Sequence, residues 1–277
     1  MRVPERITAQ PAPEGDGRAG IVVDRLSHHY VNPQTGESVH ALDDVSLSID
    51  EHECVTVVGP SGCGKSTLLK AVAGLIRPTA GTITSGGNQV RGPARDRGVV
   101  FQELAILPWR TVRRNIGHGL ELQKVPRRER EDRVAYFVEL MGLSGFEDHY
   151  PHELSGGMKQ RVAVARTWAA DPDVILMDEP FAAVDAQTRL TLQEELLRIS
   201  VTESKTMLFI THNVEEAVFL GDRVVVMSRR PGRIKEVVPV PAPRDQRDLA
   251  ALSDSRSRPA EVAAVIDGVL KLVRAEV

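Results

Sequence analysis

A glycine-rich stretch at residues 59–67 has the composition and spacing of a phosphate-binding loop. It reads Gly-Pro-Ser-Gly-Cys-Gly-Lys-Ser-Thr and matches the template Gly-x4-Gly-Lys-Ser/Thr. Glycines let several backbone N–H groups converge on one anion, and the dipole of a following helix adds positive potential. We expect Lys65 to reach the β- and γ-phosphates and Ser66 to take a Mg²⁺ position. The alternative is a glycine-rich turn with a surface lysine. The predicted phosphate-binding residues are Gly59, Pro60, Ser61, Gly62, Cys63, Gly64, Lys65, Ser66 and Thr67.

Two carboxylates, Asp178 and Glu179, follow a short apolar run at residues 174–177. Such a run suits a buried parallel strand, and the carboxyl ends of parallel strands face the ligand crevice of a sheet. Asp178 is therefore a candidate Mg²⁺ ligand, and Glu179 is a candidate for polarising an attacking water. The alternative is an acidic turn at the end of a strand.

A second candidate anion site is the turn Ser155-Gly156-Gly157, which precedes the helix-forming residues 158–170. A glycine turn that opens a helix presents backbone N–H groups and a positive dipole end. The alternative is a helix cap with Ser155 at the N-cap. One chain cannot easily place two such helix termini on one γ-phosphate, whereas two chains arranged head to tail could.

The apolar pattern predicts the elements that position these motifs. We expect one strand to begin at residue 21, and a bulge is possible in the next strand, at residues 42–49. The strand at residues 97–101 is expected to end at Gln102. Further strands are expected at residues 54–58, 81–84, 174–177, 207–210, 224–227 and 233–238. We expect helices at residues 66–73, 112–122, 126–141, 158–170, 186–199 and 259–273. Residues 1–19 are rich in Pro, Gly and charge and are expected to be mobile, and residues 241–258 are expected to form a linker.

The composition favours a globular chain with one large domain, or one domain and a smaller lobe. The 277 residues carry a net charge of −3, whereas a nucleic-acid binder usually shows a strong basic excess. The two cysteines, Cys54 and Cys63, suggest a reducing compartment rather than a disulfide scaffold. Cys63 is interpreted as a small filler of the loop, although a thiol near a helix N-terminus can be reactive.

The sequence shows neither a membrane span nor a signal peptide. Every apolar run is shorter than the ~18 residues needed to cross a bilayer, and the N-terminus lacks an apolar core. We therefore expect the chain to stay in the cytoplasm and to act at a membrane only through a partner.

The combination of residues 155–161, Ser-Gly-Gly-Met-Lys-Gln-Arg, with residues 176–180, Leu-Met-Asp-Glu-Pro, resembles the nucleotide-binding subunits of ABC transporters. The resemblance covers residues 21–240. It implies an α/β fold of the P-loop NTPase (RecA-like) type with an antiparallel β subdomain. It also implies an ATPase domain at residues 20–240, a helical subdomain inserted at about 103–165, and a linker and C-terminal helix at 241–277. The implied cofactors are ATP and Mg²⁺, and the implied working form is a homodimer.

The resemblance implies roles for residues whose types alone do not indicate a function. Tyr30 matches the aromatic residue that stacks on adenine, and Gln102 matches the glutamine that touches Mg²⁺ and the water and links to the membrane partner. Asp185 matches the loop that crosses the dimer interface, and His212 matches the histidine that contacts the γ-phosphate. Unaided, these four would be interpreted as a core or edge tyrosine, a polar strand end, a helix N-cap and a structural histidine.

Taken together, these assignments define the predicted site. The expected catalytic residues are Lys65, Gln102, Glu179 and His212. The expected metal ligands are Ser66, Gln102 and Asp178. The expected nucleotide contacts outside the loop are Tyr30, Ser155, Gly156, Gly157 and Asp185. Two departures from the family pattern, Val184 in place of Leu and Asn213 in place of Asp, remove no catalytic group.

Residues 101–109, 179–181 and 227–234 are similar to the importer ATPases for nitrate, sulfonates and taurine. Importers for bicarbonate, cyanate and thiamine precursors share much of this pattern. The similarity implies uptake of a small anion through a separate integral membrane permease, with an extracytoplasmic solute-binding protein and no nucleic acid. It implies a peripheral location on the cytoplasmic face of the plasma (inner) membrane. Part of residues 104–109 is then expected to face a groove for a short permease helix.

Two other classes remain as alternatives. One is a soluble ABC-type ATPase that acts on DNA or ribosomes. Three features argue against this class: the single cassette, the negative net charge and the lack of a coiled-coil insertion. The other is an exporter ATPase, which only the importer-like segments disfavour.

Overall fold

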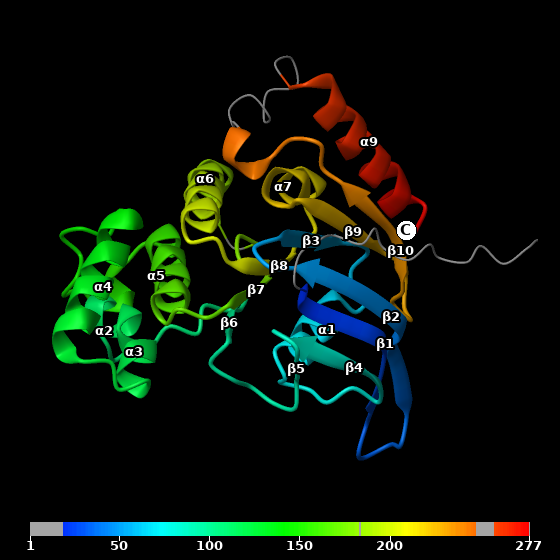
Figure 1. Ribbon diagram of the computed structural model, residues 1–277, viewed down its shortest axis with the longest axis horizontal. Helices are drawn as coiled ribbons and strands as arrows, with labels where there is room; N and C mark the ends of the chain where they lie inside the picture. The colour runs from blue at the N-terminus through cyan, green and yellow to red at the C-terminus, as the bar shows by residue number, and fades with distance from the viewer. Residues whose placement is uncertain (1–18, 183, 248–257, 277) are drawn as a thin grey trace, which may run out of the picture.

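Two β-sheets form the centre of the molecule (Figure 1). The structure is a computed structural model that describes residues 19–182, 184–247 and 258–276. The 4-stranded sheet has the order β2-β1-β4-β5, and the 6-stranded sheet has the order β10-β9-β3-β8-β7-β6. These sheets, with helices around them, confirm the predicted α/β class and its antiparallel β subdomain.

The smaller sheet is antiparallel throughout. Its strands are β1 (Ala19–Val31), β2 (Ser38–Asp50), β4 (Ala80–Ser85) and β5 (Asn88–Gln89). The pairing of β1 with β2 shifts between Leu26, which faces Val45, and His28, which faces Leu42. This shift places an extra residue in β2 and confirms the predicted bulge, which bends the strand locally. The short β5 was not predicted.

The larger sheet carries the strands that lead to the predicted site. Its members are β3 (Cys54–Val58), β6 (Arg97–Val100), β7 (Val174–Asp178), β8 (Thr206–Ile210), β9 (Arg223–Met227) and β10 (Ile234–Pro239). All run parallel except β10, which pairs antiparallel to β9. Every residue of β3, β7 and β8 is buried. A strand covered on both faces is mainly apolar, which explains the nearly continuous apolar runs in the sequence.

Alternate residues of these strands enter two separate cores, because side chains on a strand point to opposite faces in turn. Val55 and Val57 of β3 pack with α1 (Lys65–Val72) and the antiparallel sheet. Cys54 and Val58 pack on the other face, where the core also contains residues of the helices at 156–169, 186–202, 214–220 and 260–274. The parallel sheet is therefore the middle layer of the molecule.

Four α-helices and a short 3-10 helix (Pro151–Glu153) lie between β6 and β7, in the lobe on the left of Figure 1. The α-helices are α2 (Val112–Ile116), α3 (His118–Leu122), α4 (Arg127–Leu140) and α5 (Gly156–Ala169). The single helix predicted at residues 112–122 is wrong in detail, since α2 ends and α3 begins at Gly117. A Cβ at Gly117 would lie 3.2 Å from Val134 Cγ2 of α4, so a glycine allows the close approach of these helices.

The last third of the described chain adds α6 (Ala186–Thr202), α7 (Val214–Leu220) and α9 (Ala260–Arg274). Val262, Ile266 and Val269 form the buried stripe of α9, which packs on α7 and β9. The predicted C-terminal helix is thereby confirmed, whereas α7 was not predicted. Residues 1–18, the bulk of the segment expected to be mobile, and 248–257 of the expected linker lie outside the described residues. No helix within the described ranges has the length and apolar character required to cross a membrane.

Candidate active site

The glycine-rich loop connects β3 to α1 and encloses the Lys65 side chain. Lys65 Nζ donates hydrogen bonds to the carbonyl oxygens of Gly59 (2.9 Å) and Pro60 (3.1 Å), and Lys65 is only 6% exposed. Gly64 caps α1 with a φ of 111°, and a Cβ there would lie 2.8 Å from the Ala41 carbonyl oxygen. The loop therefore needs glycine at this position, and it holds a cation at the N-terminus of a helix.

Ser66 and Asp178 meet because β3 and β7 end at the same edge of the parallel sheet. Ser66 Oγ donates to Asp178 Oδ1 at 2.9 Å. Burial raises the pKa of the Asp178 carboxyl, and the hydrogen bond from Ser66 opposes this shift. A hydroxyl and a carboxylate oxygen are hard ligands, and Mg²⁺ is usually held by one or two carboxylates together with substrate phosphates. The pair therefore fits a Mg²⁺ position.

Glu179 and His212 form the second contact between strand ends. Glu179 N donates to the Ile210 carbonyl oxygen at 2.9 Å, which ties the residue after β7 to the end of β8. His212 Nδ1 lies 2.9 Å from Glu179 Oε2, and an ionised carboxylate can only accept, so the imidazole donates from Nδ1. His212 remains largely exposed, and its other ring nitrogen is available to a ligand.

Tyr30 lies beside the start of α1. Its hydroxyl is 3.4 Å from Thr67 Oγ1, its ring packs edge-on against His28, and 41% of its surface is exposed. The ring is therefore near the loop and accessible to a planar ligand. Gln102 is also exposed, two residues beyond the end of β6 at Val100. The predicted strand end at Gln102 is wrong, but β6 still delivers Gln102 to the same sheet edge as Asp178.

The remaining predicted residues lie apart from this group. Ser155 caps α5, where its Oγ accepts from Met158 N at 3.3 Å, and Asp185 caps α6 by accepting from Thr188 N at 3.0 Å. Ser155, Gly156 and Asp185 are exposed, and Gly157 packs beside Thr188. Figure 1 shows α5 in the helical lobe, away from α1 beneath the sheet. Within the described ranges, no hydrogen bond connects these residues to the loop.

The prediction missed Glu216, which lies in the first turn of α7 next to His212. Glu216 is 5% exposed, and its carboxylate accepts hydrogen bonds from Thr211 Oγ and from Gln193 Nε2. The sequence does contain a signal for the start of this helix, because Asn213 and Glu216 have the spacing of an N-cap and an acidic third helical residue. Asn213 is indeed the N-cap of α7.

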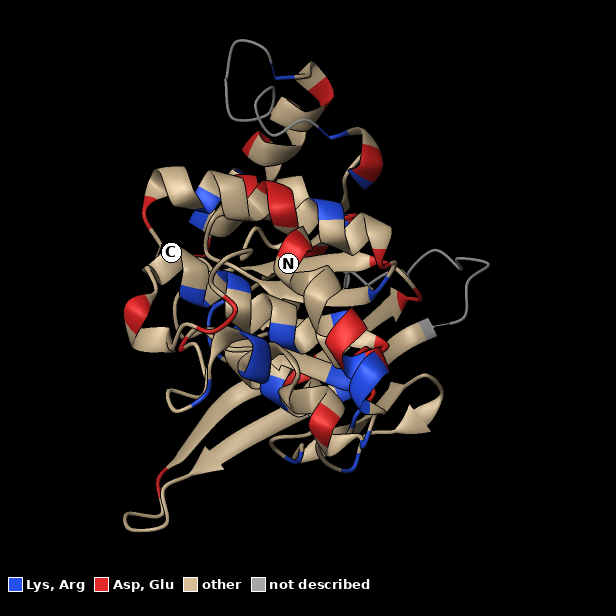
Figure 2. Ribbon diagram, turned by 90° about the vertical axis from the view of Figure 1, so that its left-hand side faces the viewer, with Lys and Arg blue, Asp and Glu red and all other residues tan. Residues whose placement is uncertain are grey.

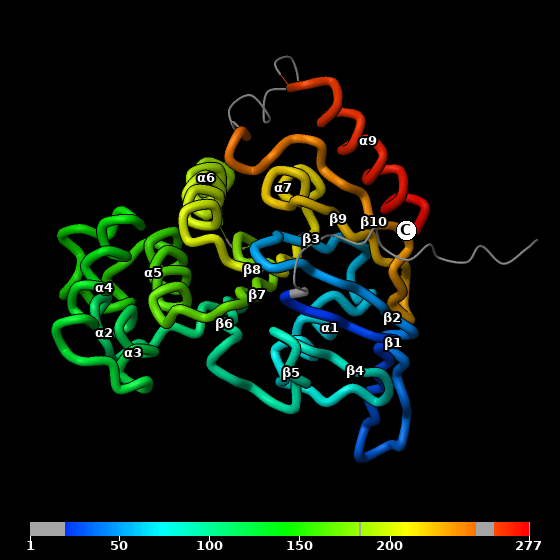
Figure 3. The backbone as a smooth tube through the Cα atoms, viewed as in Figure 1, coloured from blue at the N-terminus to red at the C-terminus, as the bar shows by residue number. Residues whose placement is uncertain are grey.

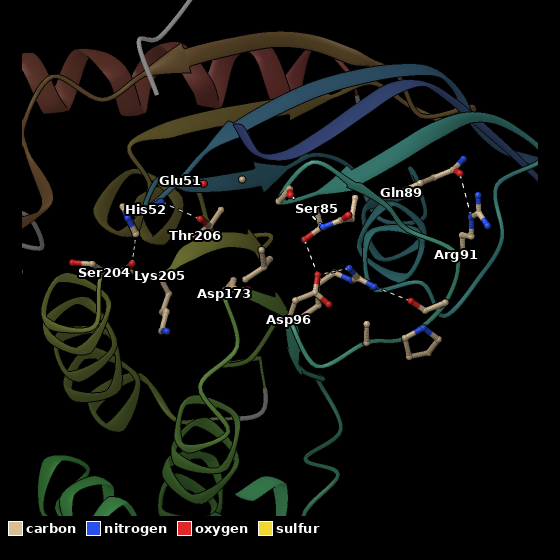
Figure 4. A pocket seen from close by; sticks show the side chains of 18 residues that line it. Glu51, His52, Ser85, Gln89, Arg91, Asp96, Asp173, Ser204, Lys205 and Thr206 are labelled. Atoms are coloured by element: carbon tan, nitrogen blue, oxygen red, sulfur yellow. Dashed lines mark hydrogen bonds and ion pairs between the residues drawn. The ribbon is translucent and has the colours of Figure 1, made fainter. Parts of the chain in front are cut away.

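A cavity of about 730 Å³ lies at the opposite edge of the sheet (Figure 4). Asp173 and Val174 at the start of β7, together with Lys205 and Thr206 at the start of β8, contribute to its wall. It is therefore at the amino ends of the strands, whereas the loop, Asp178 and Glu179 are at the carboxyl ends. Ligands of open α/β sheets bind at the carboxyl ends, so this cavity is not the candidate site.

Comparison with known proteins agrees with this geometry. Residues 42–182, about half of the chain, match the family model described as ABC transporter. The taurine import ATP-binding protein of Roseobacter denitrificans is 44% identical over 237 residues, which are 86% of this chain and 87% of that protein. The nitrate import ATP-binding protein of Synechocystis is 50% identical over 209 residues, which are 76% of this chain and 79% of that protein.

A solved structure with the same fold is the dimeric, post-hydrolysis state of an ATP-binding cassette bound to ADP and Pi. It is 29% identical to this chain, has a TM-score of 0.71, and covers 80% of this chain and 99% of its own. The family match, the relatives and the shared fold agree. The chain belongs to the ABC transporter family as one of its ATP-binding, ATPase subunits.

Proposed function

We propose that the chain hydrolyses MgATP as a head-to-tail homodimer and thereby drives uptake of a small anion of the nitrate, sulfonate or taurine class. The observation that carries the proposal is the division of the predicted site. Lys65, Ser66, Asp178, Glu179 and His212 gather at one sheet edge, while the Ser155 turn lies exposed on another part of the surface. The import ATP-binding relatives and the dimeric cassette with ADP and Pi support this assignment.

Each residue at the sheet edge has a task that follows from its contacts. Lys65 Nζ supplies positive charge to the β- and γ-phosphates, and the Tyr30 ring stacks on the adenine. Glu179 polarises the attacking water, and His212, held by Glu179, presents its free ring nitrogen to the γ-phosphate. Ser66, Asp178 and Gln102 would hold Mg²⁺, which when bound neutralises charge on the phosphates.

The second subunit completes the site. In the proposed dimer the N-terminus of α5, with Ser155, Gly156 and Gly157, contacts the γ-phosphate that the partner's loop holds, and Asp185 lies at the interface. All four residues belong to helix N-termini, where backbone N–H groups favour an anion or a polar partner. ATP then bridges the subunits, and its hydrolysis allows them to separate.

The helical lobe is the proposed contact with the permease. A groove of about 1170 Å³ runs between α2, α3 and α4, and the 70% exposed Trp109 lies on its wall. Figure 2 shows basic and acidic residues mixed on this side of the molecule. An apolar ring in a groove with charges of both signs suits an amphipathic helix of a partner rather than a polyphosphate.

The proposal also covers the organisation and location of the system. Residues 20–240 are the ATPase domain with its helical subdomain at about 103–165, and residues 241–277 are a tail. The chain works on the cytoplasmic face of the membrane, and an extracytoplasmic solute-binding protein delivers the anion to the permease. The two import ATP-binding relatives support the direction of transport.

The experiment that tests the proposal separates ATP binding from hydrolysis. Glu179→Gln keeps the shape of the side chain but removes the carboxylate, so hydrolysis should fall by about 10²–10⁴ while ATP stays bound. Size-exclusion chromatography should then show a dimer with MgATP and a monomer without it. Adding Ser155→Arg should abolish the dimer and leave ATP binding intact. A Glu179→Gln variant that stays monomeric with saturating MgATP, or a dimer that survives Ser155→Arg, contradicts the composite site.

A further inference from the structure

The segment that carries His212 is held on both sides by hydrogen bonds to its neighbours. The backbone leaves β8 and turns at once into α7 (Figure 3). Thr211 N donates to the Val57 carbonyl oxygen of β3 at 3.2 Å, and Asn213 N donates to Thr211 Oγ at 3.0 Å. His212 lies between these two residues and is itself exposed. Its position therefore depends on Thr211 and Asn213 rather than on packing of its own ring.

Glu216 closes this arrangement from α7. Thr211 Oγ donates to Glu216 Oε2, and Glu216 N donates to Asn213 Oδ1 at 3.2 Å. On its other side, Glu216 Oε1 accepts from Gln193 Nε2 of α6 at 2.7 Å. The carboxylate thus connects Thr211, the residue before His212, to α6, whose N-cap is Asp185, and the backbone N–H of Glu216 holds Asn213.

We propose that Glu216 is a positioning residue for ATP hydrolysis, which holds His212 within hydrogen-bond reach of Glu179. The inference rests on the proposed function for its effect on turnover, but its geometric part concerns only the His212–Glu179 contact of 2.9 Å. Among the described residues, Glu216 forms no hydrogen bond with the predicted nucleotide contacts or with Glu179. It acts through Thr211 and Asn213, which fix the backbone on either side of the imidazole.

The chemistry of the site favours this role over ordinary packing. A buried carboxylate costs free energy, and burial raises the pKa of Glu216 even though Thr211 and Gln193 donate hydrogen bonds to it. An apolar residue would fill the space between α6 and α7 at lower cost. A carboxylate is instead suited to accept two hydrogen bonds in fixed directions, and one of them leads to the residue before His212.

The test compares Glu216→Ala with a control that loosens the same helix elsewhere. Thr56 Oγ donates to the Ala217 carbonyl oxygen of α7 at 3.0 Å, and Thr56 is fully buried, so Thr56→Val weakens α7 without touching the His212 segment. Glu216→Ala should lower kcat by about 10- to 100-fold and change KM by less than about twofold, since small displacements of reacting groups have effects of this size. Thr56→Val should lower the melting temperature and leave kcat unchanged.

A second readout does not depend on activity. In protein labelled with ¹⁵N-histidine, the imidazole signals of His212, assigned by their loss in His212→Gln, should shift in Glu216→Ala and stay in place in Thr56→Val. If wild-type protein shows no ATPase activity but these signals behave as expected, the proposed function fails and the geometric part of the proposal, that Glu216 positions His212 beside Glu179, stands. Should the signals and kcat match wild type in Glu216→Ala, or should Thr56→Val lower kcat as much as Glu216→Ala does, the positioning role is overturned.

Thr211 provides a variant for the case in which Glu216→Ala does not fold. Thr211→Val removes the hydroxyl that joins Glu216 to the His212 segment but keeps the shape of the buried side chain. Thr211→Ser restores the hydroxyl. The proposal requires Thr211→Val to reproduce the kcat loss and the signal shift, and Thr211→Ser to recover at least half of the wild-type rate. Wild-type behaviour of Thr211→Val contradicts it.

Discussion

The N-termini of α1 and α5 are both glycine-rich turns that open a helix, yet their surroundings differ completely. At α1, Lys65 is buried and bonded to its own loop, and Ser66 is joined to Asp178 from a distant strand. At α5, Ser155 and Gly156 are exposed, and within the described part of the chain the Ser155 side chain bonds only to the backbone of its own first turn. One terminus is built into the fold, and the other is presented at the surface.

In the proposed dimer, this difference indicates which half of the site each chain supplies. The α1 terminus has Lys65, Ser66 and Asp178 in place within one chain, so in the proposed function one chain binds the nucleotide by itself. The α5 terminus has the backbone N–H groups for an anion, and its Ser155 and Gly156 are exposed. A second copy of the chain is the partner that the proposed dimer brings to it. Variants at the two termini should therefore fail in different ways.

The largest effect is expected for Lys65→Ala at the α1 terminus. Lys65 supplies the charge inside the loop, and loss of one charge-stabilising donor in an active site typically lowers kcat by about 10²–10³. Nucleotide binding should weaken as well, because the same charge attracts the bound phosphates. Steady-state ATPase measurements and fluorescent-ATP titration check both effects. Unchanged turnover in Lys65→Ala would remove the α1 loop from the proposed site.

Ser155→Arg at the α5 terminus should lower turnover strongly but leave ATP binding near the wild-type value, so its combined effect is smaller than that of Lys65→Ala. The arginine places bulk where the second subunit must approach, and it does not touch the loop. Ser155→Ala is the matched control, since loss of an N-cap costs about 1 kcal/mol of stability but adds no bulk. If Ser155→Arg weakens ATP binding as much as Lys65→Ala does, the two termini act within one chain and the comparison is wrong.

The sequence predicted the parallel strands and the loop well because their signals are local. The apolar run at residues 174–177 is a buried strand, and the glycine template lies between a strand and a helix. Strand order depends on pairings between residues far apart in the chain, such as Val55 with Leu208. These pairings cannot be predicted from a single sequence. The meeting of Ser66 with Asp178 was foreseen only through the rule on strand ends.

The failures of prediction have physical causes that can be named. The region 112–122 has helical periodicity, but Gly117 divides it where α4 packs close. Helix α7 is short and follows a strand directly, so its periodic signal is weak. Glu216 was missed because acidic residues in a first helical turn are usually solvated, whereas this one is turned inward toward Thr211 and Gln193.

A smaller effect is expected for Tyr30, which lies at the side of the α1 terminus. Base stacking depends on ring area rather than on the hydroxyl, and its contact with Thr67 is long at 3.4 Å. Tyr30→Phe should therefore bind ATP like wild type, and Tyr30→Ala should lose about 1 kcal/mol, or about fivefold in affinity. Fluorescent-ATP titration of the three proteins decides the point. Equal affinities would place Tyr30 outside the nucleotide site.

The smallest functional effect is expected from thiol reagents, and it compares the two termini directly. Cys63 in the α1 loop is 1% exposed, and burial raises the pKa of its thiol; burial also raises the pKa of Cys54 to about 12. The thiolate is the reactive form, so at pH 8 both native thiols should react more slowly than a free cysteine, with rates that rise as the pH rises. These facts favour Cys63 as a filler of the loop, and brief maleimide treatment should leave most ATPase activity intact.

A Ser155→Cys variant places an exposed thiol at the N-terminus of α5. The helix dipole there lowers the thiol pKa, so this cysteine should react with maleimide near pH 7–8. Mass spectrometry of labelled peptides measures both rates in one sample, with Cys63 as the internal control. In a Glu179→Gln background, MgATP should protect the cysteine at position 155 because the second subunit covers it. Rapid labelling of Cys63, or no protection at position 155, would show that the two helix termini do not differ as their burial indicates.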